Sequence, residues 1–245
     1  MQFDFTPIGV VHSCFKEKFG IPRQAGLVPD APAELELLPP WNRFEAVREL
    51  SGFSHVWILF VFHQSLGKSW KPTVRPPRLG GNKRIGVFAT RSPFRPNPIG
   101  LSAVRLERIE NRDGRLLLHL RGADLVDGTP VLDIKPYVPY ADAIGTARSG
   151  FAADAPRARL AVSFGAAAEA MLERIESNRS NLLKKLISEV IEQDPRPAYI
   201  EAGAAYRMFG MRLLDFNVRW TMHRDRALVV SIEAVTEKAP DGPEG

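Results

Sequence analysis

Three prolines within six residues constrain the folding of this chain more than any other feature. Pro93, Pro96 and Pro98 lie inside the stretch Gly86–Leu106. Each proline fixes its own φ, removes a backbone donor and pushes the residue before it toward an extended conformation. Short apolar runs flank the prolines on both sides, which is typical of strands. The pattern predicts a stiff, non-helical loop held between two strands.

The side chains between these prolines are suited to binding. Two guanidinium groups, an aromatic ring and an amide share the loop, on Arg91, Arg95, Phe94 and Asn97. A loop that is already stiff loses little conformational entropy when it binds a ligand. The alternative is a structural proline corner whose arginines are merely solvated.

Positive charge is concentrated around this loop. The interval from Lys68 to Arg108 contains ten basic residues and a single acid, Glu107, whereas the whole chain carries a net charge of only +5. Such a block predicts an anionic partner, most commonly a phosphate backbone. A solvated patch balanced by acids elsewhere in the fold is the other interpretation.

Strand signals dominate the first 140 residues. The candidate strands are Phe5–His12, Phe53–Phe62, Ile85–Phe88, Ile99–Leu106, Leu116–Leu120 and Val131–Val138. Phe53–Phe62 is apolar on both faces and predicts a strand covered on both sides. Asn42–Leu50 predicts one short helix. Because long amphipathic patterns are missing between the strands, the class is mainly β, a small antiparallel barrel or a sandwich.

The composition changes after a linker at Ala141–Pro156. Ala166–Glu176 and Ser180–Gln193 have helical apolar spacing, with Ser180 as a plausible N-cap of the second helix. Residues 214–235 predict a hairpin that turns at 223–226. We therefore expect two domains, a β-domain over 1–145 and a small α+β domain over 156–238.

Several classes of protein are disfavoured. Cys14 is the single cysteine, so no intramolecular disulfide can form, and the N-terminus lacks a secretory signal; both predict a cytoplasmic protein. The longest apolar run, Val56–Phe62, is too short to span a bilayer. Five histidines at no metal-ligand spacing predict that no metal is bound.

Seven motifs together resemble the TsaA/YaeB family of bacterial tRNA methyltransferases. They are PRQ at Pro22–Gln24, FSHVWILFVFHQ at Phe53–Gln64, RPPRLGG at Arg75–Gly81, GVFATRSPFRPNPIGLS at Gly86–Ser102, DLVDGTPVLDIKPY at Asp124–Tyr137, QDPRPAY at Gln193–Tyr199 and DFNVRW at Asp215–Trp220. They cover both expected domains.

The resemblance implies an S-adenosylmethionine-dependent enzyme with a β-barrel catalytic domain, acting as a homodimer. Its implied substrate is the threonine tRNA, and the methyl group goes onto the exocyclic N6 of the threonylcarbamoyl-adenosine beside the anticodon. Two other hypotheses remain open on the residues alone. One is a non-catalytic RNA-binding module, and the other is an enzyme acting on a small anion without tRNA.

The resemblance also assigns roles to individual residues. Methyl-donor contacts are expected at Pro22, Arg23, Gln24, His63, Gln64, Arg91, Leu101, Asp124, Leu125, Val126, Asp127, Gly128 and Thr129. Substrate contacts are expected at Phe94, Arg95, Asn97, Asp194, Arg196, Tyr199 and Asn217. For the chemistry, Asp127 and Asp133 are candidate proton acceptors, and Arg91 can orient a carboxylate or phosphate through its planar fork.

Overall fold

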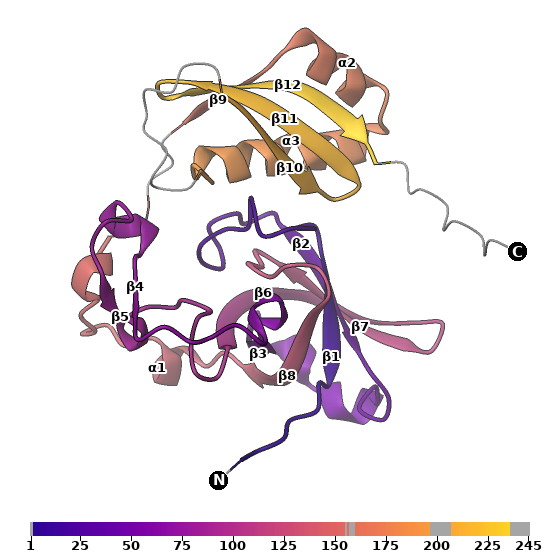
Figure 1. Cartoon of the computed structure of the whole chain (residues 1–245). Helices are drawn as coiled ribbons and strands as arrows, with labels where there is room; N and C mark the ends of the chain where they lie inside the picture. Colours follow the sequence, from indigo (N-terminus) through magenta and orange to yellow (C-terminus); the bar gives the residue numbers. More distant parts are fainter. Residues whose placement is uncertain (1, 155, 157–159, 197–206, 236–245) are drawn as a thin grey trace, which may run out of the picture.

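The first unit of the molecule is a closed antiparallel β-barrel. The computed structural model describes residues 2–154, 156, 160–196 and 207–235, and Figure 1 shows the barrel below a second sheet. The barrel order is β1-β2-β7-β6-β3-β8. The bounds are β1 (Gly9–Ser13), β2 (Pro32–Leu37), β3 (His55–Val61), β6 (Ile99–Arg112), β7 (Arg115–Arg121) and β8 (Thr129–Pro136). The mainly β, barrel-type prediction is confirmed.

Alternating side chains fill the barrel. On β3, Val56, Ile58 and Phe60 are buried, and the residues between them are partly exposed. A barrel strand has one inner face, so the expectation of a β3 covered equally on both sides is wrong. Phe60 pairs with Gly100, where an added Cβ would lie 2.2 Å from the Phe60 ring. Gly100 therefore leaves room for this ring.

The second unit is a four-stranded sheet with two helices. Its order is β10-β11-β12-β9, with β9 parallel to β12. The bounds are β9 (Ala161–Phe164), β10 (Met208–Leu213), β11 (Phe216–His223), β12 (Arg226–Ala234), α2 (Ala166–Glu173) and α3 (Ser177–Glu192). Leu183, Leu186 and Ile187 of α3 share one buried cluster with Trp220. The predicted hairpin is confirmed as β11 and β12.

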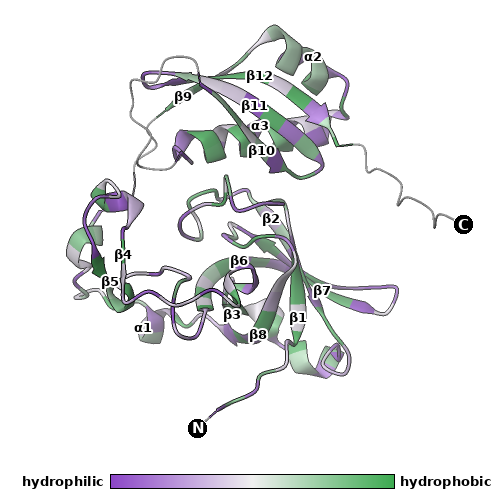
Figure 2. Ribbon diagram, in the orientation of Figure 1, coloured by the Kyte–Doolittle hydropathy of each residue, from purple (hydrophilic) through white to green (hydrophobic). Residues whose placement is uncertain are grey.

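Shorter elements lie in the segments between barrel strands and after the last of them. They are β4 (Thr73–Val74), β5 (Ile85–Gly86), α1 (Pro139–Asp142) and single 3-10 turns at Phe44–Val47, Leu50–Gly52, His63–Ser65, Pro77–Leu79, Val87–Ala89 and Gly150–Ala152. Figure 2 shows green and purple residues intermixed along both units. Within the described residues, no helix is long and apolar enough to cross a membrane.

Three local predictions differ from the structure. Asn42–Leu50 forms 3-10 turns instead of one helix. Ser180 lies inside α3, where its hydroxyl donates to the Leu172 carbonyl over 2.9 Å, so it is not the N-cap. Ile85–Phe88 gives only the short β5, which pairs with β4 and not with the barrel. The sixth barrel strand is β2, which sequence reasoning missed.

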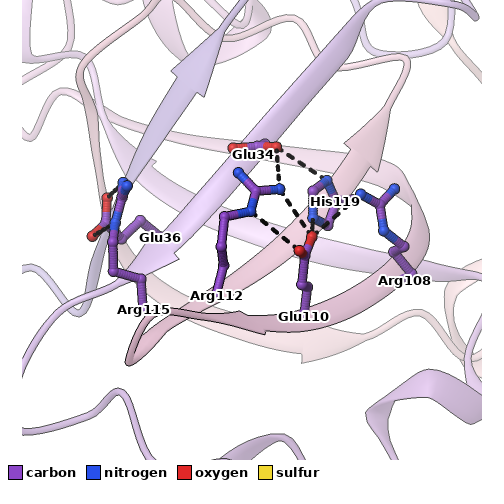
Figure 3. A network of polar contacts seen from close by, with 7 residues as sticks. All are labelled: Glu34, Glu36, Arg108, Glu110, Arg112, Arg115 and His119. Atoms are coloured by element: carbon purple, nitrogen blue, oxygen red, sulfur yellow. Dashed lines mark hydrogen bonds and ion pairs between the residues drawn. The ribbon is translucent and has the colours of Figure 1, made fainter.

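The outer face of β2, β6 and β7 carries a network of ion pairs (Figure 3). Arg115 Nε donates to Glu36 over 2.7 Å. The ring of His12, on β1, lies 2.9 Å from the same carboxylate. His119 lies 2.7 Å from Glu110, to which Arg112 also donates. The contact between Arg115 and Glu36 joins β7 to β2, strands that are distant in the sequence.

Acid is expected to weaken the fold through this network. Hydrogen bonds from Arg115 and His12 lower the pKa of Glu36 to about 2. A carboxyl with a depressed folded pKa stabilises the native state above its unfolded pKa, and this contribution is lost as the pH falls through the folded value. The melting temperature should therefore decrease as the pH is lowered from about 5 to about 2. Circular dichroism melts should show a smaller fall for Glu36→Gln.

The control for this prediction is Glu45→Gln, because Glu45 is exposed on a 3-10 turn outside the network. It should lose stability with acid as the wild type does. An equal acid dependence in the wild type and Glu36→Gln would contradict the prediction.

Candidate functional site

A pocket of about 550 Å³ lies at one end of the barrel. In the antiparallel register Val61 pairs with Ile99, and Phe60 pairs with Val131. The end of β3 thus meets the beginnings of β6 and β8. Residues from these three strand ends line the pocket together with the 22–24 and 90–95 loops. The volume is in the usual range for a pocket that binds a small molecule, about 300–1,000 Å³.

Most of the predicted donor-binding residues meet in this pocket. Those that line it are Pro22, Arg23, Gln24, His63, Gln64, Arg91, Leu101, Asp124, Leu125, Val126 and Thr129. Phe94 and Arg95, predicted to contact the substrate, line it too. Spacing along the chain cannot show this convergence, because five separate segments supply the residues.

Other predicted residues do not line the pocket. Asp127 accepts a hydrogen bond from the Ser13 amide over 2.8 Å and pairs with Lys16 at 3.0 Å. Asp133 pairs with Lys135 at 2.9 Å on β8. Gly128 and Asn97 are also absent from the lining, and both are exposed. The two candidate bases are thus ion-paired outside the pocket.

The C-terminal candidates lie in different places. Asp194 lines a smaller cavity of about 100 Å³, which shares Pro22 and Arg23 with the main pocket. Arg196 Nε donates to Asp194 over 2.6 Å. Asn217 is exposed on β11 and lines neither cavity. Tyr199 lies outside the described residues.

Two buried polar atoms of the pocket residues have no hydrogen-bond partner in the described structure, His63 Nδ1 and Asp124 Oδ1. Burial lowers the pKa of His63, with a further contribution from the Lys18 charge, and so favours the neutral imidazole. Burial also raises the pKa of Asp124, which the Ser102 hydroxyl and the Arg91 charge partly offset. Unpartnered buried polar groups are costly unless a ligand satisfies them.

Hydrogen bonds hold the proline loop in one conformation. The Arg95 guanidinium donates to the Thr90 carbonyl over 2.7 Å and to the Val87 carbonyl over 3.3 Å. Arg91 donates to the Gln24 side chain, which joins the loop to the PRQ motif. The prediction of a non-helical loop is confirmed, since 91–98 contains neither helix nor strand.

Sequence reasoning missed several lining residues. They include Lys18, Trp57, Phe60, Thr90 and Ser102. Trp57 and Phe60 sit in an apolar strand, where nothing in the sequence separates a pocket wall from the core. Lys18 lies in a polar segment, and tertiary contacts such as its hydrogen bond to the Gln64 carbonyl place it at the pocket.

Comparison with known proteins identifies the family. A model of the tRNA-methyltransferase O N-terminal domain matches residues 10–143, and one of the TrmO C-terminal domain matches residues 157–235. The chain belongs to the TrmO family. The TsaA/YaeB resemblance is confirmed, and the family is one of tRNA methyltransferases.

Individual relatives support the same conclusion. The tRNA (adenine(37)-N6)-methyltransferase of Escherichia coli K12 is 53% identical over 219 residues, which cover 89% of this chain and 93% of that protein. A Pyrococcus abyssi protein, named as a probable S-adenosyl-L-methionine-binding protein, is 40% identical over 147 residues, 60% of this chain and 74% of its own length.

A solved structure of a TrmO protein has the same fold. The crystal structure of TrmO from Pseudomonas aeruginosa superposes with a TM-score of 0.78 at 43% identity, covering 96% of this chain and 99% of that chain. The similarity extends over both units. The barrel with its α+β companion is therefore a TrmO architecture.

Proposed function

We propose that this chain transfers a methyl group from S-adenosylmethionine to N6 of threonylcarbamoyl-adenosine, beside the anticodon of the threonine tRNA. The observation that supports this most is that most of the predicted donor-binding residues line one pocket, with the unpartnered atoms of His63 and Asp124 among them. Relatives named as adenine(37)-N6 methyltransferases support the reaction class. The proposed tRNA substrate places the reaction in the cytoplasm.

The pocket residues fit the donor chemically. S-adenosylmethionine, when bound, supplies an electrophilic sulfonium methyl group. His63 Nδ1 and Asp124 Oδ1 offer polar partners for its hydroxyl, amino or ring groups, and Leu125 gives a buried apolar surface. Among the described residues, no cluster of acidic, histidine or cysteine side chains could hold a metal ion. The chain's task is then to hold the substrate nitrogen in line with the methyl group.

The reacting nitrogen must lose a proton, which a carboxylate of the protein or the substrate's own groups could accept. Asp124 is the candidate that the geometry favours, since it lines the pocket and burial raises its pKa. A base with a raised pKa accepts a proton more readily. Asp127 and Asp133 remain predicted proton acceptors. Wild-type single-turnover rates in Asp127→Asn and Asp133→Asn would exclude both residues from this role.

Arg91 and Arg95 are proposed to receive the anionic part of the substrate. Arg95 is already held by two backbone carbonyls. Arg91 is exposed, so its fork can turn toward the threonyl carboxylate or a phosphate. Phe94 offers an aromatic ring for stacking on a base.

We further propose two RNA-contacting surfaces. One is the basic block from Lys68 to Arg108, which borders the pocket through Arg91 and Arg95. The other is the open face of the second sheet, where Asn217 pairs across strands with Arg212. Asp194 and Arg196, at the end of α3, extend the proposed contact toward the smaller cavity.

The basic block makes RNA affinity depend on salt. Each phosphate contact contributes about one unit to the slope of log affinity against log salt concentration. We expect Arg75→Ala and Arg84→Ala each to reduce this slope by about one unit and to weaken the binding of all tRNAs to the same extent. Filter binding over a salt series measures the slope. A slope unchanged in both variants would exclude these arginines as phosphate contacts.

We also propose that the chain acts as a homodimer. Trp70, Phe88 and Leu101 are large apolar residues, yet they are 51%, 72% and 51% exposed, and Leu101 also lines the pocket. A second copy could bury such side chains. Sedimentation equilibrium would give the mass of two chains, and a monomer at all concentrations would contradict the proposal.

The decisive experiment for the function uses labelled donor. Radiolabelled S-adenosylmethionine is incubated with threonine tRNA that carries or lacks the threonylcarbamoyl group. We expect incorporation only into the modified tRNA. Incorporation into both would exclude the threonylcarbamoyl requirement, and no incorporation with intact RNA binding would favour a non-catalytic RNA-binding module.

A further inference from the structure

The segment between β1 and β2, residues 14–31, takes part in both units. It leaves the barrel after β1 and returns to it as β2. Nevertheless Cys14, Phe15, Val28 and Ala31 lie in the buried cluster of the second sheet and not in the barrel core. Figure 1 shows this indigo loop rising from the barrel toward β10.

The first residues of this segment cover the edge of β10. The amide of Leu214 donates to the Cys14 carbonyl over 2.8 Å. Phe15 forms an antiparallel bridge with Leu213. The amide of Arg212 donates to the Glu17 carboxylate over 2.9 Å. The segment is therefore fixed to the sheet by its backbone as well as by its side chains.

Phe19 anchors the segment immediately before the pocket. Its ring stacks on Trp220 with centroids 5.9 Å apart and an interplanar angle of 15°. Trp220 is fully buried. The next residue, Gly20, has φ +90°, and an added Cβ would lie 3.1 Å from Met211 Sδ. The chain can approach the sheet this closely because Gly20 has no side chain.

The residues after this anchor form the pocket wall. Ile21 and the PRQ motif, Pro22–Gln24, line the main pocket. Lys18 Nζ donates to the Gln64 carbonyl over 3.2 Å, at a second wall. The amide of Asp127 donates to the Phe15 carbonyl over 2.8 Å and so attaches the Asp124–Thr129 wall. Three walls of the pocket are thus tied to a segment that the second sheet holds.

The far end of the segment is fixed as well. Lys185 of α3 pairs with the Asp30 carboxylate, and the Asp30 amide donates to Glu189 over 3.3 Å. Arg121 of the barrel donates to the Asp30 carbonyl over 2.9 Å. Both ends of the segment are fixed, and the Phe19 ring helps to hold its middle on the sheet. Loss of this ring should therefore let the pocket-lining residues Ile21–Gln24 shift.

We propose that Phe19, by stacking on Trp220, is a positioning residue for methyl-donor binding, so that the second sheet sets the donor affinity of the barrel pocket. This inference rests on the proposed function of the main pocket. It gives the second unit a role in donor binding that is separate from its proposed contact with tRNA.

The test compares two ring deletions around one tryptophan. Phe209 also stacks on Trp220, with centroids 5.8 Å apart, but it lies on β10 and lines neither cavity. Phe19→Ala and Phe209→Ala should therefore both lower the melting midpoint. In calorimetric titrations with S-adenosylhomocysteine, only Phe19→Ala should weaken binding, by about tenfold. Phe19→Tyr keeps the ring and should bind S-adenosylhomocysteine with the wild-type affinity.

Each outcome decides between separate claims. If the wild type does not bind S-adenosylhomocysteine, the proposed function of the pocket fails. If the wild type binds and Phe19→Ala binds equally well, the positioning role fails and the proposed function stands. Equal weakening in Phe19→Ala and Phe209→Ala would show general destabilisation and would also overturn the inference.

Discussion

Replacing Asp124 with asparagine is expected to lower the methyl-transfer rate by at least about 100-fold, the usual contribution of a general base. The substitution keeps the shape of the side chain but removes its capacity to accept a proton. Single-turnover assays at saturating donor and tRNA measure the chemical step directly. If the rate is unchanged and only the KM for the donor rises, Asp124 binds the donor and is not the base.

The same substitution should have the opposite effect on stability. Burial raises the pKa of Asp124, so its charged form is disfavoured in the fold. With a folded pKa above the unfolded value, the stabilisation from Asp124 is fully present below the unfolded pKa and is lost as the pH rises through the folded value. At neutral pH, Asp124→Asn should therefore melt at the same temperature as the wild type or higher.

Asp127→Asn is the matched control for Asp124→Asn. The carboxylate of Asp127 accepts the Ser13 amide and pairs with Lys16, so its neutralisation should lower the melting midpoint. We expect Asp124→Asn to lose activity and to keep or gain stability, whereas Asp127→Asn should lose stability. This pair of results would identify Asp124 as a site carboxylate and Asp127 as a structural one. The same direction of stability change in both variants would contradict this assignment.

Replacing Arg91 with lysine is expected to lower kcat/KM by about 10- to 100-fold. Lysine keeps the charge but loses the planar fork and the contact with Gln24. A hydrogen bond to a charged group is worth about 1.5–3 kcal/mol, which corresponds to this range of rates. Steady-state kinetics with threonylcarbamoylated tRNA measure the effect.

Arg84→Lys is the control for Arg91→Lys, because Arg84 lies in the basic block but does not line the pocket. It should keep the wild-type kcat/KM, since the positive charge is retained. Equal losses in the two variants would mean that the fork geometry of Arg91 has no special role in the site.

The barrel was largely predictable because its strands follow the periodic apolar pattern. The exception is β2, which reads PAELEL and alternates apolar residues with two glutamates, but its proline, alanine and glutamates have low strand propensity. The structure explains them, since Glu36 faces outward to Arg115 and His12. Antiparallel pairing with β7, far along the chain, completes this strand.

The composition of the site was predictable from motifs, but its geometry was not. Asp124 and Asp127 are three residues apart on one loop and cannot be ranked by sequence. Burial separates them, because Asp124 lines the pocket and Asp127 pairs with Lys16. The stack of Phe19 on Trp220 joins residues two hundred positions apart, and no local pattern indicates it.

Hydrogen–deuterium exchange with and without S-adenosylhomocysteine tests the central claim most directly. If the barrel pocket binds the donor, protection should rise at 18–24, 60–65, 90–95, 99–102 and 124–129, the segments that line it. The outer β6–β7 hairpin should exchange as before. Protection confined to the hairpin or to the second sheet, with none in these five segments, would contradict the account.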